Sequence, residues 1–311
     1  MDTATVTLAI ATMAVIIILG AGFAFRFPIT IEVKQLFMGI IINIAVPSII
    51  LNGVFNTELT DEIMQQVLIV FGFSIVFNVF AVFFSFLIGK IFRFQTSMAK
   101  KLAILAAFGN SGFIGVPLCA TIFGPIGGLL AAVFDAGLDV VLFSVGVYFL
   151  QSHGSFDFRH LKAMINAPLI AITAGLLFAI SGLNAPVLLQ DLTSMLSSIA
   201  APLAMLYIGF LLPPFFQKGQ SFIFPQLWFP ISMRLLLIPA ISVTVITFLP
   251  LDHFLQQIFV ILTAMPTFML ATVLFSRYTN VEDTSVMTVI YSTILCLGTI
   301  PIVVLFANFI S

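Results

Sequence analysis

Residues 101–123, KLAILAAFGNSGFIGVPLCATIF, form an apolar stretch that is long enough to cross a lipid bilayer but is interrupted in its middle. A helix needs about 20 apolar residues to cross a hydrocarbon core of about 30 Å. Within the stretch, Gly109, Gly112 and Gly115 each disfavour a helix by about 1 kcal/mol relative to alanine. Pro117 removes a backbone hydrogen bond and clashes with the preceding turn. The stretch therefore predicts a membrane helix that is broken at membrane depth.

Nine further apolar stretches of similar length accompany this one. Hydrophobic residues make up 61% of the 311 positions and charged residues 7%, whereas a water-soluble domain carries about 25% charged residues. The composition excludes a sizeable soluble domain and predicts an all-α integral membrane protein with ten transmembrane helices. The helices are expected at 5–25, 33–55, 66–91, 101–123, 127–150, 164–182, 190–212, 221–249, 255–276 and 284–309.

The basic residues of the predicted loops all fall in odd-numbered loops, counted from the N-terminus. The even-numbered loops carry acids instead, among them Glu58, Asp61 and Asp252. Because cytoplasmic loops are enriched in Lys and Arg, the odd loops are expected in the cytoplasm and both termini outside. The basic loop residues are Arg26, Lys34, Lys90, Arg93, Lys100, Lys101, Arg159, Lys162, Lys218 and Arg277.

Five predicted helices precede the central basic loop and five follow it. Because five is odd, similarity between the halves must be an inverted-topology repeat, a plan found in many secondary transporters. The prolines are in register: Pro47 in the second helix matches Pro202 in the seventh, and Pro117 in the fourth matches Pro266 in the ninth. We therefore predict a first repeat at 1–150, a cytoplasmic linker at 151–163 and a second repeat at 164–311.

The ninth stretch is expected to break at Met265-Pro266-Thr267, as the fourth does at Gly109–Pro117. Unwound backbone survives at membrane depth only where it lines a cavity or is covered by protein. If the two breaks cross, two helix N-termini point at one spot, and their free N–H groups favour an anion. The alternative is a pair of kinked helices that pack through small residues without a ligand.

The segment Ala107–Leu118 resembles the fourth-helix signature of the auxin efflux carrier family. Similar resemblances cover Asn43–Leu51, Ala201–Gly209, and Ala264–Thr267 followed by Leu274–Tyr278 and Tyr291–Thr293. The resemblance spans most of the chain, and the short central loop is similar to that of the bacterial members. It implies a multi-pass protein of the bacterial inner membrane.

The resemblance also implies an architecture and a site. The fold is that of the bile acid symporters, with two inverted five-helix repeats and crossing, broken helices 4 and 9. Helices 1, 2, 6 and 7 form a scaffold that makes a homodimer, and helices 3–5 and 8–10 form a moving transport domain. The crossover is the family's substrate site, and family members carry auxin, malonate or other small carboxylates. Phe268 departs from the small residue that is common there and is expected to narrow the cavity.

Carried over by position, the resemblance assigns the substrate site to Asn110, Gly112, Pro117, Met265, Pro266 and Thr267. Ser111 joins this set because its hydroxyl, like the amide of Asn110, can hydrogen-bond freed backbone groups or a solute.

Three charged residues lie well inside predicted helices, where each costs about 2.5–3.5 kcal/mol on insertion scales. Asp135 and Asp139 are four residues apart in the fifth helix and share one face. Because two ionised carboxylates would repel, one is protonated or a cation lies between them. We therefore predict a proton- or sodium-coupling site at Asp135 and Asp139, with Asn78 as a further member.

Arg234, in the eighth helix, admits several interpretations. Its planar fork suits bidentate binding of a substrate carboxylate. It could instead pair with Asp135 or Asp139 as a structural salt bridge, or extend toward the cytoplasm, since the eighth stretch is long.

The features together predict a secondary transporter of a small organic anion (a carboxylate, auxin-like or dicarboxylate) that works by alternating access. The alternative is a membrane solute sensor or a channel with a ligand site at the crossover. An intramembrane aspartyl protease is disfavoured because Asp135 and Asp139 share one helix, so we do not expect an enzyme. The two cysteines have no metal-ligand spacing. We expect no cofactor and no nucleic-acid partner, only substrate, lipid and coupling ion.

Overall fold

A computed structural model describes residues 3–58, 60–151, 165–213 and 225–310. Within these ranges the chain is helical, and the only strand-like pairing is one isolated bridge. The predicted linker (beyond Gln151), with Arg159 and Lys162, and Lys218 of the seventh loop lie outside the described residues. The elements, in which η marks a π-helix, are α1 Thr3–Arg26, α2 Ile31–Ile40, η1 Ile41–Ala45, α3 Val46–Phe55, α4 Asp61–Ile91, α5 Thr96–Ala107, η2 Ser111–Gly115, α6 Val116–Val141, η3 Leu142–Gly146, α7 Val147–Leu150, α8 Ala167–Ile180, α9 Val187–Ser198, α10 Ala200–Leu211, α12 Trp228–Ser232, η5 Met233–Leu237, α13 Ile238–Phe248, α14 His253–Thr263, α15 Ala271–Tyr278 and α16 Glu282–Ile310.

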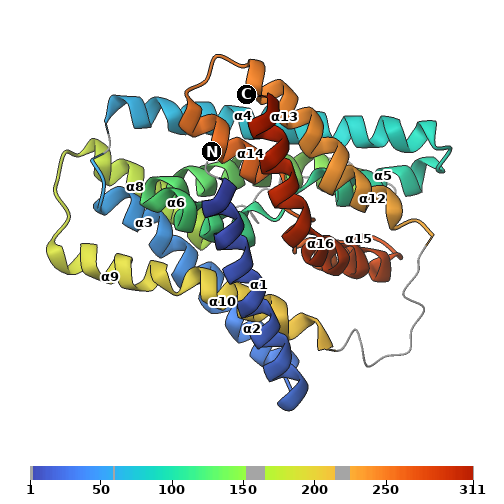
Figure 1. Cartoon of the computed structure of the whole chain (residues 1–311), viewed down its shortest axis with the longest axis horizontal. Helices are drawn as coiled ribbons and strands as arrows, with labels where there is room; N and C mark the ends of the chain where they lie inside the picture. The colour runs from blue at the N-terminus through green and yellow to red at the C-terminus, as the bar shows by residue number, and fades with distance from the viewer. Residues whose placement is uncertain (1–2, 59, 152–164, 214–224, 311) are drawn as a thin grey trace.

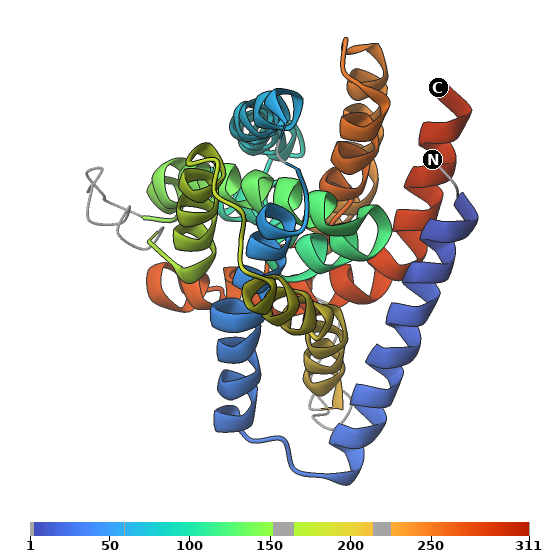
Figure 2. The same ribbon diagram turned by 90° about the vertical axis from the view of Figure 1, so that its left-hand side faces the viewer.

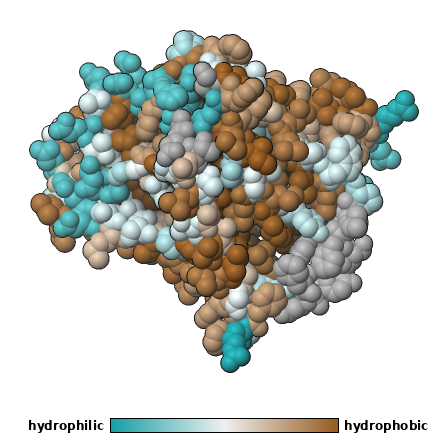
Figure 3. Space-filling model, in the orientation of Figure 1, coloured by the Kyte–Doolittle hydropathy of each residue, from teal (hydrophilic) through white to brown (hydrophobic). Residues whose placement is uncertain are grey.

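Seven helical runs in the described chain are long and apolar enough to cross a membrane, so this is a multi-pass membrane protein. Two further apolar helices, α8 and α14, are shorter. Apolar residues cover much of the molecular face in Figure 3, while hydrophilic residues gather toward its upper left and at two projecting tips. The seven long runs are Ala4–Arg26, Ile31–Phe55, Asp61–Ile91, Ser111–Leu150, Val187–Leu211, Trp228–Phe248 and Glu282–Ile310.

The run Ser111–Leu150 folds back on itself at Gly124. A straight helix of 40 residues would be about 60 Å long, twice the thickness of the bilayer core. At Gly124, φ is 73° and ψ is −165°, a conformation that glycine adopts freely, and Pro125 follows. A Cβ atom on Gly128 would lie 3.0 Å from the Cβ of Ala120, eight residues earlier, which requires a reversal of the chain. The run is therefore a helical hairpin, as the two predicted stretches 101–123 and 127–150 require.

Polar side chains start several of the helices by accepting a hydrogen bond from the backbone N–H three residues later. Thr30 does so for α2, Thr60 for α4, Asn166 for α8 and Asp252 for α14. Such caps satisfy one of the N–H groups that a helix leaves without a partner. Proline follows Asn166 within the first turn, where it does not disturb the helix.

The N-terminal and C-terminal halves of the chain pack together through α1 and α10, which cross in Figure 1. A Cβ atom on Gly20 would lie 2.7 Å from the carbonyl oxygen of Leu206, and one on Gly209 would collide with the backbone of α1. Small residues let the two backbones approach, as is common between membrane helices. Figure 2 shows α1 beside α16, with both termini at one end of the molecule.

Loop contacts follow the predicted alternation of the chain. Lys101 Nζ donates to Asn280 Oδ1 at 2.9 Å, which joins the predicted third and ninth loops. At other sites Asn56 Nδ2 donates to the carbonyl of Gln190 at 3.2 Å, and Gln66 Nε2 donates to Asp252 Oδ2 at 3.2 Å. In these three bonds an odd loop contacts an odd loop and even loops contact even loops.

Candidate functional site at a helix crossover

The predicted break in the fourth helix is confirmed. Helix α5 ends at Ala107, residues 108–110 are not helical, and the chain resumes at Ser111 as the π-helix η2. Pro117 is the second residue of α6, so its missing N–H falls in the first turn of that helix. Three glycines and one proline in nine residues account for the interruption.

The predicted break in the ninth helix is confirmed as well. Helix α14 ends at Thr263 and α15 begins at Ala271, with Pro266 between them. The two breaks lie side by side and are joined by an antiparallel bridge between Gly109 and Thr267. The backbone N–H of Asn110 donates to the carbonyl of Pro266 at 2.7 Å, and the backbone N–H of Phe268 donates to the carbonyl of Phe108 at 3.1 Å. Each unwound segment therefore satisfies backbone groups of the other.

Arg234, from η5, lies behind this crossover and is fully buried. Its three nitrogens each donate to a backbone carbonyl: Nη1 to Ala107 at 2.7 Å, Nη2 to Thr263 at 2.8 Å and Nε to Met265 at 2.7 Å. Ala107 and Thr263 are the last residues of α5 and α14. One guanidinium thus stabilises the negative ends of two helix dipoles.

The structure brings Arg234 to the crossover but not to the carboxylates. Within the described residues its partners are the three carbonyls, not Asp135 or Asp139, and its burial excludes extension toward the membrane surface. Gly109 lies against the guanidinium, because a Cβ atom there would be 2.6 Å from Nη2 of Arg234.

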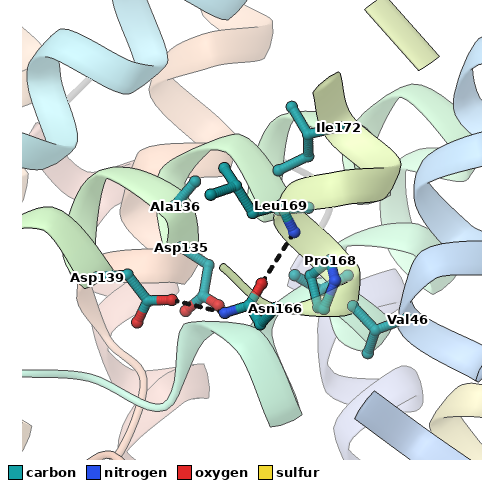
Figure 4. A pocket seen from close by; sticks show the side chains of 10 residues that line it. Val46, Asp135, Ala136, Asp139, Asn166, Pro168, Leu169 and Ile172 are labelled. Carbon is teal, nitrogen blue, oxygen red and sulfur yellow. Dashed lines mark hydrogen bonds between the residues drawn. The ribbon is translucent and has the colours of Figure 1, made fainter. Parts of the chain in front are cut away.

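Asp135 and Asp139 project from one face of α6, as their spacing predicts (Figure 4). Asp135 Oδ1 accepts a hydrogen bond from Ser111 Oγ at 2.6 Å, and the carboxylate lies against the backbone of Gly112. Asp139 Oδ2 accepts from Asn166 Nδ2 at 3.2 Å. Beside the pair is a void of about 10 Å³, the size of one water molecule or small cation.

A cavity of about 1020 Å³ connects the crossover to the surface. At its inner end it is lined by Gly109, Asn110 and Gly112, with Asp135 and Asp139 beside them. Tyr207 of α10 and Phe268 line it as well. Its lining also includes Lys34 of α2 and Arg277 of α15, which lie near the predicted first and ninth loops. The ring of Phe268 stands edge-on to Phe108, with centroids 5.6 Å apart. Phe268 therefore stands at the crossover and forms part of the cavity wall.

Asn110 is the crossover residue with an unused hydrogen-bonding group. Its side chain is 4% exposed and its Nδ2 has no hydrogen-bond partner in the described structure. A buried amide donor without a partner costs free energy, so such groups in native proteins call for an explanation. A bound solute with an acceptor oxygen would supply the missing partner.

Three other predicted site residues, Met265, Thr267 and Asn78, pack against or hydrogen-bond to neighbouring parts of the protein. Met265 packs against Gly115, with Cγ 3.4 Å from where a Cβ would lie. Thr267 donates its hydroxyl to the carbonyl of Leu105 at 3.0 Å and its amide to Ser292 Oγ at 3.1 Å. Asn78 Nδ2 donates to the carbonyl of Ser74, and the residue lines neither the cavity nor the void. The structure therefore does not bring Asn78 to the carboxylate pair.

Asn166 and Tyr207 are two of the lining residues that were not among the predicted site residues. Asn166 could have been found from Asn-Ala-Pro at 166–168, which is typical of a capped helix start, although its bond to Asp139 has no local signal. Tyr207 stands in an apolar stretch, and its position on the cavity depends on the packing of α10 against η2.

The sequence profile of a family described as membrane transport protein matches residues 5–304. The chain belongs to this family. The resemblance to the auxin efflux carriers is thereby confirmed. Membership agrees with the expectation that the chain is not an enzyme.

Archaeal members of the membrane transport protein family resemble the chain along most of its length. An uncharacterized transporter of Methanothermobacter thermautotrophicus is 25% identical over 264 residues, which cover 85% of each chain. An uncharacterized transporter of Methanocaldococcus jannaschii is 24% identical over 258 residues, covering 79% of this chain and 81% of the relative.

Proposed function

We propose that the protein is a secondary transporter that carries a small organic anion across the membrane by alternating access. The observation that carries the proposal is the large cavity, which reaches the crossover where the buried side-chain Nδ2 of Asn110 lacks a partner in the described structure. The relatives are named as transporters, without a substrate.

The chemistry of the crossover supports an anion. The helical run from Ser111 begins there, and its N-terminal N–H groups carry partial positive charge. Asn110 offers a neutral amide donor beside them, and Lys34 and Arg277 line the same cavity. A carboxylate, auxin-like or dicarboxylate, fits these donors, and the apolar wall that includes Phe113, Tyr207 and Phe268 suits an aromatic or aliphatic body.

The position of the cavity supports an inward-facing conformation. Its lining includes Lys34 of α2 and Arg277 of α15, which lie at the ends of the chain segments that the charge pattern assigns to the cytoplasm. The hairpin at Gly124 and the two shorter apolar helices support ten spans. In alternating access, helices 3–5 and 8–10 would move against a dimeric scaffold of helices 1, 2, 6 and 7 in the bacterial inner membrane. Asp135 and Asp139, with the void between them and Asn166, are the proposed proton or sodium site.

Counterflow in proteoliposomes tests the proposal. Vesicles containing the purified protein are loaded with unlabelled indole-3-acetate or malonate, and uptake of the labelled anion is followed. We expect saturable counterflow that falls at least about tenfold in Asn110→Ala, the loss that corresponds to roughly 1.4 kcal/mol. Asn43→Ala is the matched control, because Asn43 is exposed and bonds only within its own helix.

Each other outcome identifies a different function. Flux that does not saturate and shows no counterflow would indicate a channel. Anion binding without flux, measured as thermal stabilisation, would indicate a sensor; a ligand at about 100 times its dissociation constant stabilises by roughly 2.7 kcal/mol. If only cationic or neutral solutes are carried, the anion assignment is wrong.

A further inference from the structure

The carboxylate of Asp135 occupies the place where the helix N-terminus would bind an anion. It accepts a hydrogen bond from Ser111 Oγ at 2.6 Å and lies against the backbone of Gly112; these are the first two residues of the run that begins at the crossover. Gly112 has no room for a side chain, because a Cβ there would collide with the Asp135 carboxylate. The positive end of this helix is therefore already matched by a negative charge from the protein itself.

The neighbouring donor remains unused. Asn110 directly precedes Ser111, lines the same cavity as Gly112 and Asp135, and has no partner for its buried Nδ2. An anion that reached Asn110 would lie next to the N-terminus that Asp135 covers. Two negative groups at one helix end would repel each other and compete for the same N–H and O–H donors.

We propose that the Asp135 carboxylate and the substrate anion compete for this helix end, so that one anion binds together with one proton on Asp135. The inference rests on the proposed anion transport and deepens it by naming the coupling ion and its stoichiometry. The proton adds one positive charge as the anion adds one negative charge, so the net charge of the site is unchanged by binding. Protonated Asp135 releases the donors and can itself donate to the anion.

The other charged and titratable groups around Asp135 do not occupy the helix end. Asp139, on the same helix, accepts from Asn166 instead. Lys34 of α2 and Tyr207 of α10 line the cavity that Asp135 faces, and Arg277, Tyr278 and Asp283 line it from α15 and α16. Arg234 donates to three backbone carbonyls on the far side of Gly109. Asp135 is thus the carboxylate that bonds directly to Ser111 and lies against Gly112 at the helix end.

The experiment measures anion affinity against pH. The purified wild type, Asp135→Asn and Asp139→Asn are titrated with indole-3-acetate, malonate and benzenesulfonate between about pH 5.5 and 8, with thermal unfolding as readout. Benzenesulfonate stays ionised throughout, so any pH dependence comes from the protein. Asp191→Asn is the matched control, since Asp191 is an exposed carboxylate on α9.

We expect the wild-type dissociation constant to rise by up to about tenfold per pH unit, the slope for one linked proton. Asp135→Asn should bind equally well at all pH values and more tightly than the wild type at the alkaline end, while Asp139→Asn and Asp191→Asn keep the wild-type slope. In weak buffer at the alkaline end of the range, where Asp135 is ionised before binding, a pH-sensitive dye should report about one proton taken up per benzenesulfonate bound, and none in Asp135→Asn.

Three results separate the possibilities. A wild type without pH dependence, or a slope that persists in Asp135→Asn, overturns the inference but leaves anion transport intact. Absence of anion binding in every variant at every pH overturns the proposed function and this inference with it. If Asp135→Asn does not fold, Ser111→Ala replaces it: ionised Asp135 then loses a donor, and the pH at which affinity falls should move upward. If the pH at which affinity falls is the same in Ser111→Ala as in the wild type, the proposed competition between Asp135 and the anion is wrong.

Discussion

The two breaks at the crossover are bonded to the same arginine and to each other, but they differ in length and in side chains: the first covers residues 108–110 and the second residues 264–270. Both end a helix on the guanidinium of Arg234, and they bond to each other through Asn110, Pro266, Phe108 and Phe268. The first break contains Asn110, whose side-chain Nδ2 has no partner in the described structure. It is followed by a helix N-terminus where Ser111 donates to Asp135. In the second break the polar groups of Thr267 already have partners within the protein: its hydroxyl donates to the carbonyl of Leu105 and its backbone N–H to Ser292 Oγ. The second break thus supports the first, where a solute can bind.

The largest expected effect removes what the two breaks share. Arg234→Met leaves three buried carbonyls without their charged donor, and each buried acceptor left without a partner costs about 1–3 kcal/mol. We expect little folded protein after detergent extraction, measured by gel filtration and thermal unfolding. Arg234→Lys keeps the charge but not the fork and should recover only part of the stability.

Arg277→Met is the control for this substitution, because Arg277 is exposed. An Arg234→Met protein as stable as the wild type would show that the guanidinium does not hold the crossover together.

Alanine at the glycines of the first break should cost about 1–3 kcal/mol, the usual range for overpacking. Gly109→Ala meets Nη2 of Arg234, whereas Gly112→Ala meets the Asp135 carboxylate. Thermal unfolding measures both, and Gly298→Ala is the control, because nothing lies within 4 Å of a Cβ at that position.

A second substitution separates the two glycines. Asp135→Ala should relieve Gly112→Ala but not Gly109→Ala, which a double-mutant cycle measures as a coupling energy. Equal coupling to both glycines would mean that the two sides of the crossover are not independent.

A smaller effect contrasts stability with function. Thr267→Val removes a buried hydroxyl from the second break and should cost about 1 kcal/mol in stability, with little change in anion affinity. Asn110→Ala should show the reverse pattern, because the side-chain Nδ2 that it removes has no hydrogen-bond partner in the described chain. Thermal unfolding and anion titration of both variants measure the contrast. Loss of affinity in Thr267→Val alone would reverse the roles assigned to the two breaks.

The breaks themselves could be predicted because their causes are local. Gly109, Gly112 and Pro117 disfavour a continuous helix wherever they stand, and so does Pro266. The shared face of Asp135 and Asp139 also follows from spacing alone. The bonding partners could not be predicted in the same way. Arg234 contacts carbonyls that are 127, 29 and 31 residues away, and a backbone carbonyl carries no sequence signal.

The assignment of Asn78 to the carboxylate pair also shows that bonding partners cannot be predicted from the sequence pattern. A polar residue at membrane depth indicates burial against protein but not the helix it faces. Asn78 bonds to Ser74 on its own helix, while Asn166, at the start of a distant helix, reaches Asp139. Which polar residue joins the carboxylates depends on helix packing, which the pattern of one helix does not contain.

The smallest expected effect concerns the hydrogen bond between Asp139 and Asn166. Among the bonds described, no carboxylate is bonded in this way near the second break. Asn166 caps α8 through Oδ1, 2.9 Å from the amide of Leu169, and holds Asp139 through Nδ2. Asn166→Ser keeps a capping oxygen and should change stability by less than about 0.5 kcal/mol, whereas Asn166→Ala loses the cap and about 1 kcal/mol.

The functional effect of Asn166→Ser should exceed its effect on stability. Asp139 lies in the proposed transport domain and Asn166 in the proposed scaffold, so this bond has to break each time the two parts move. Weakening it lowers the barrier to that movement, and the maximal counterflow rate should rise while the apparent affinity stays constant. A change in affinity without a change in rate would instead place Asn166 in the anion site, next to Asn110, and would extend the binding region of the first break along α6.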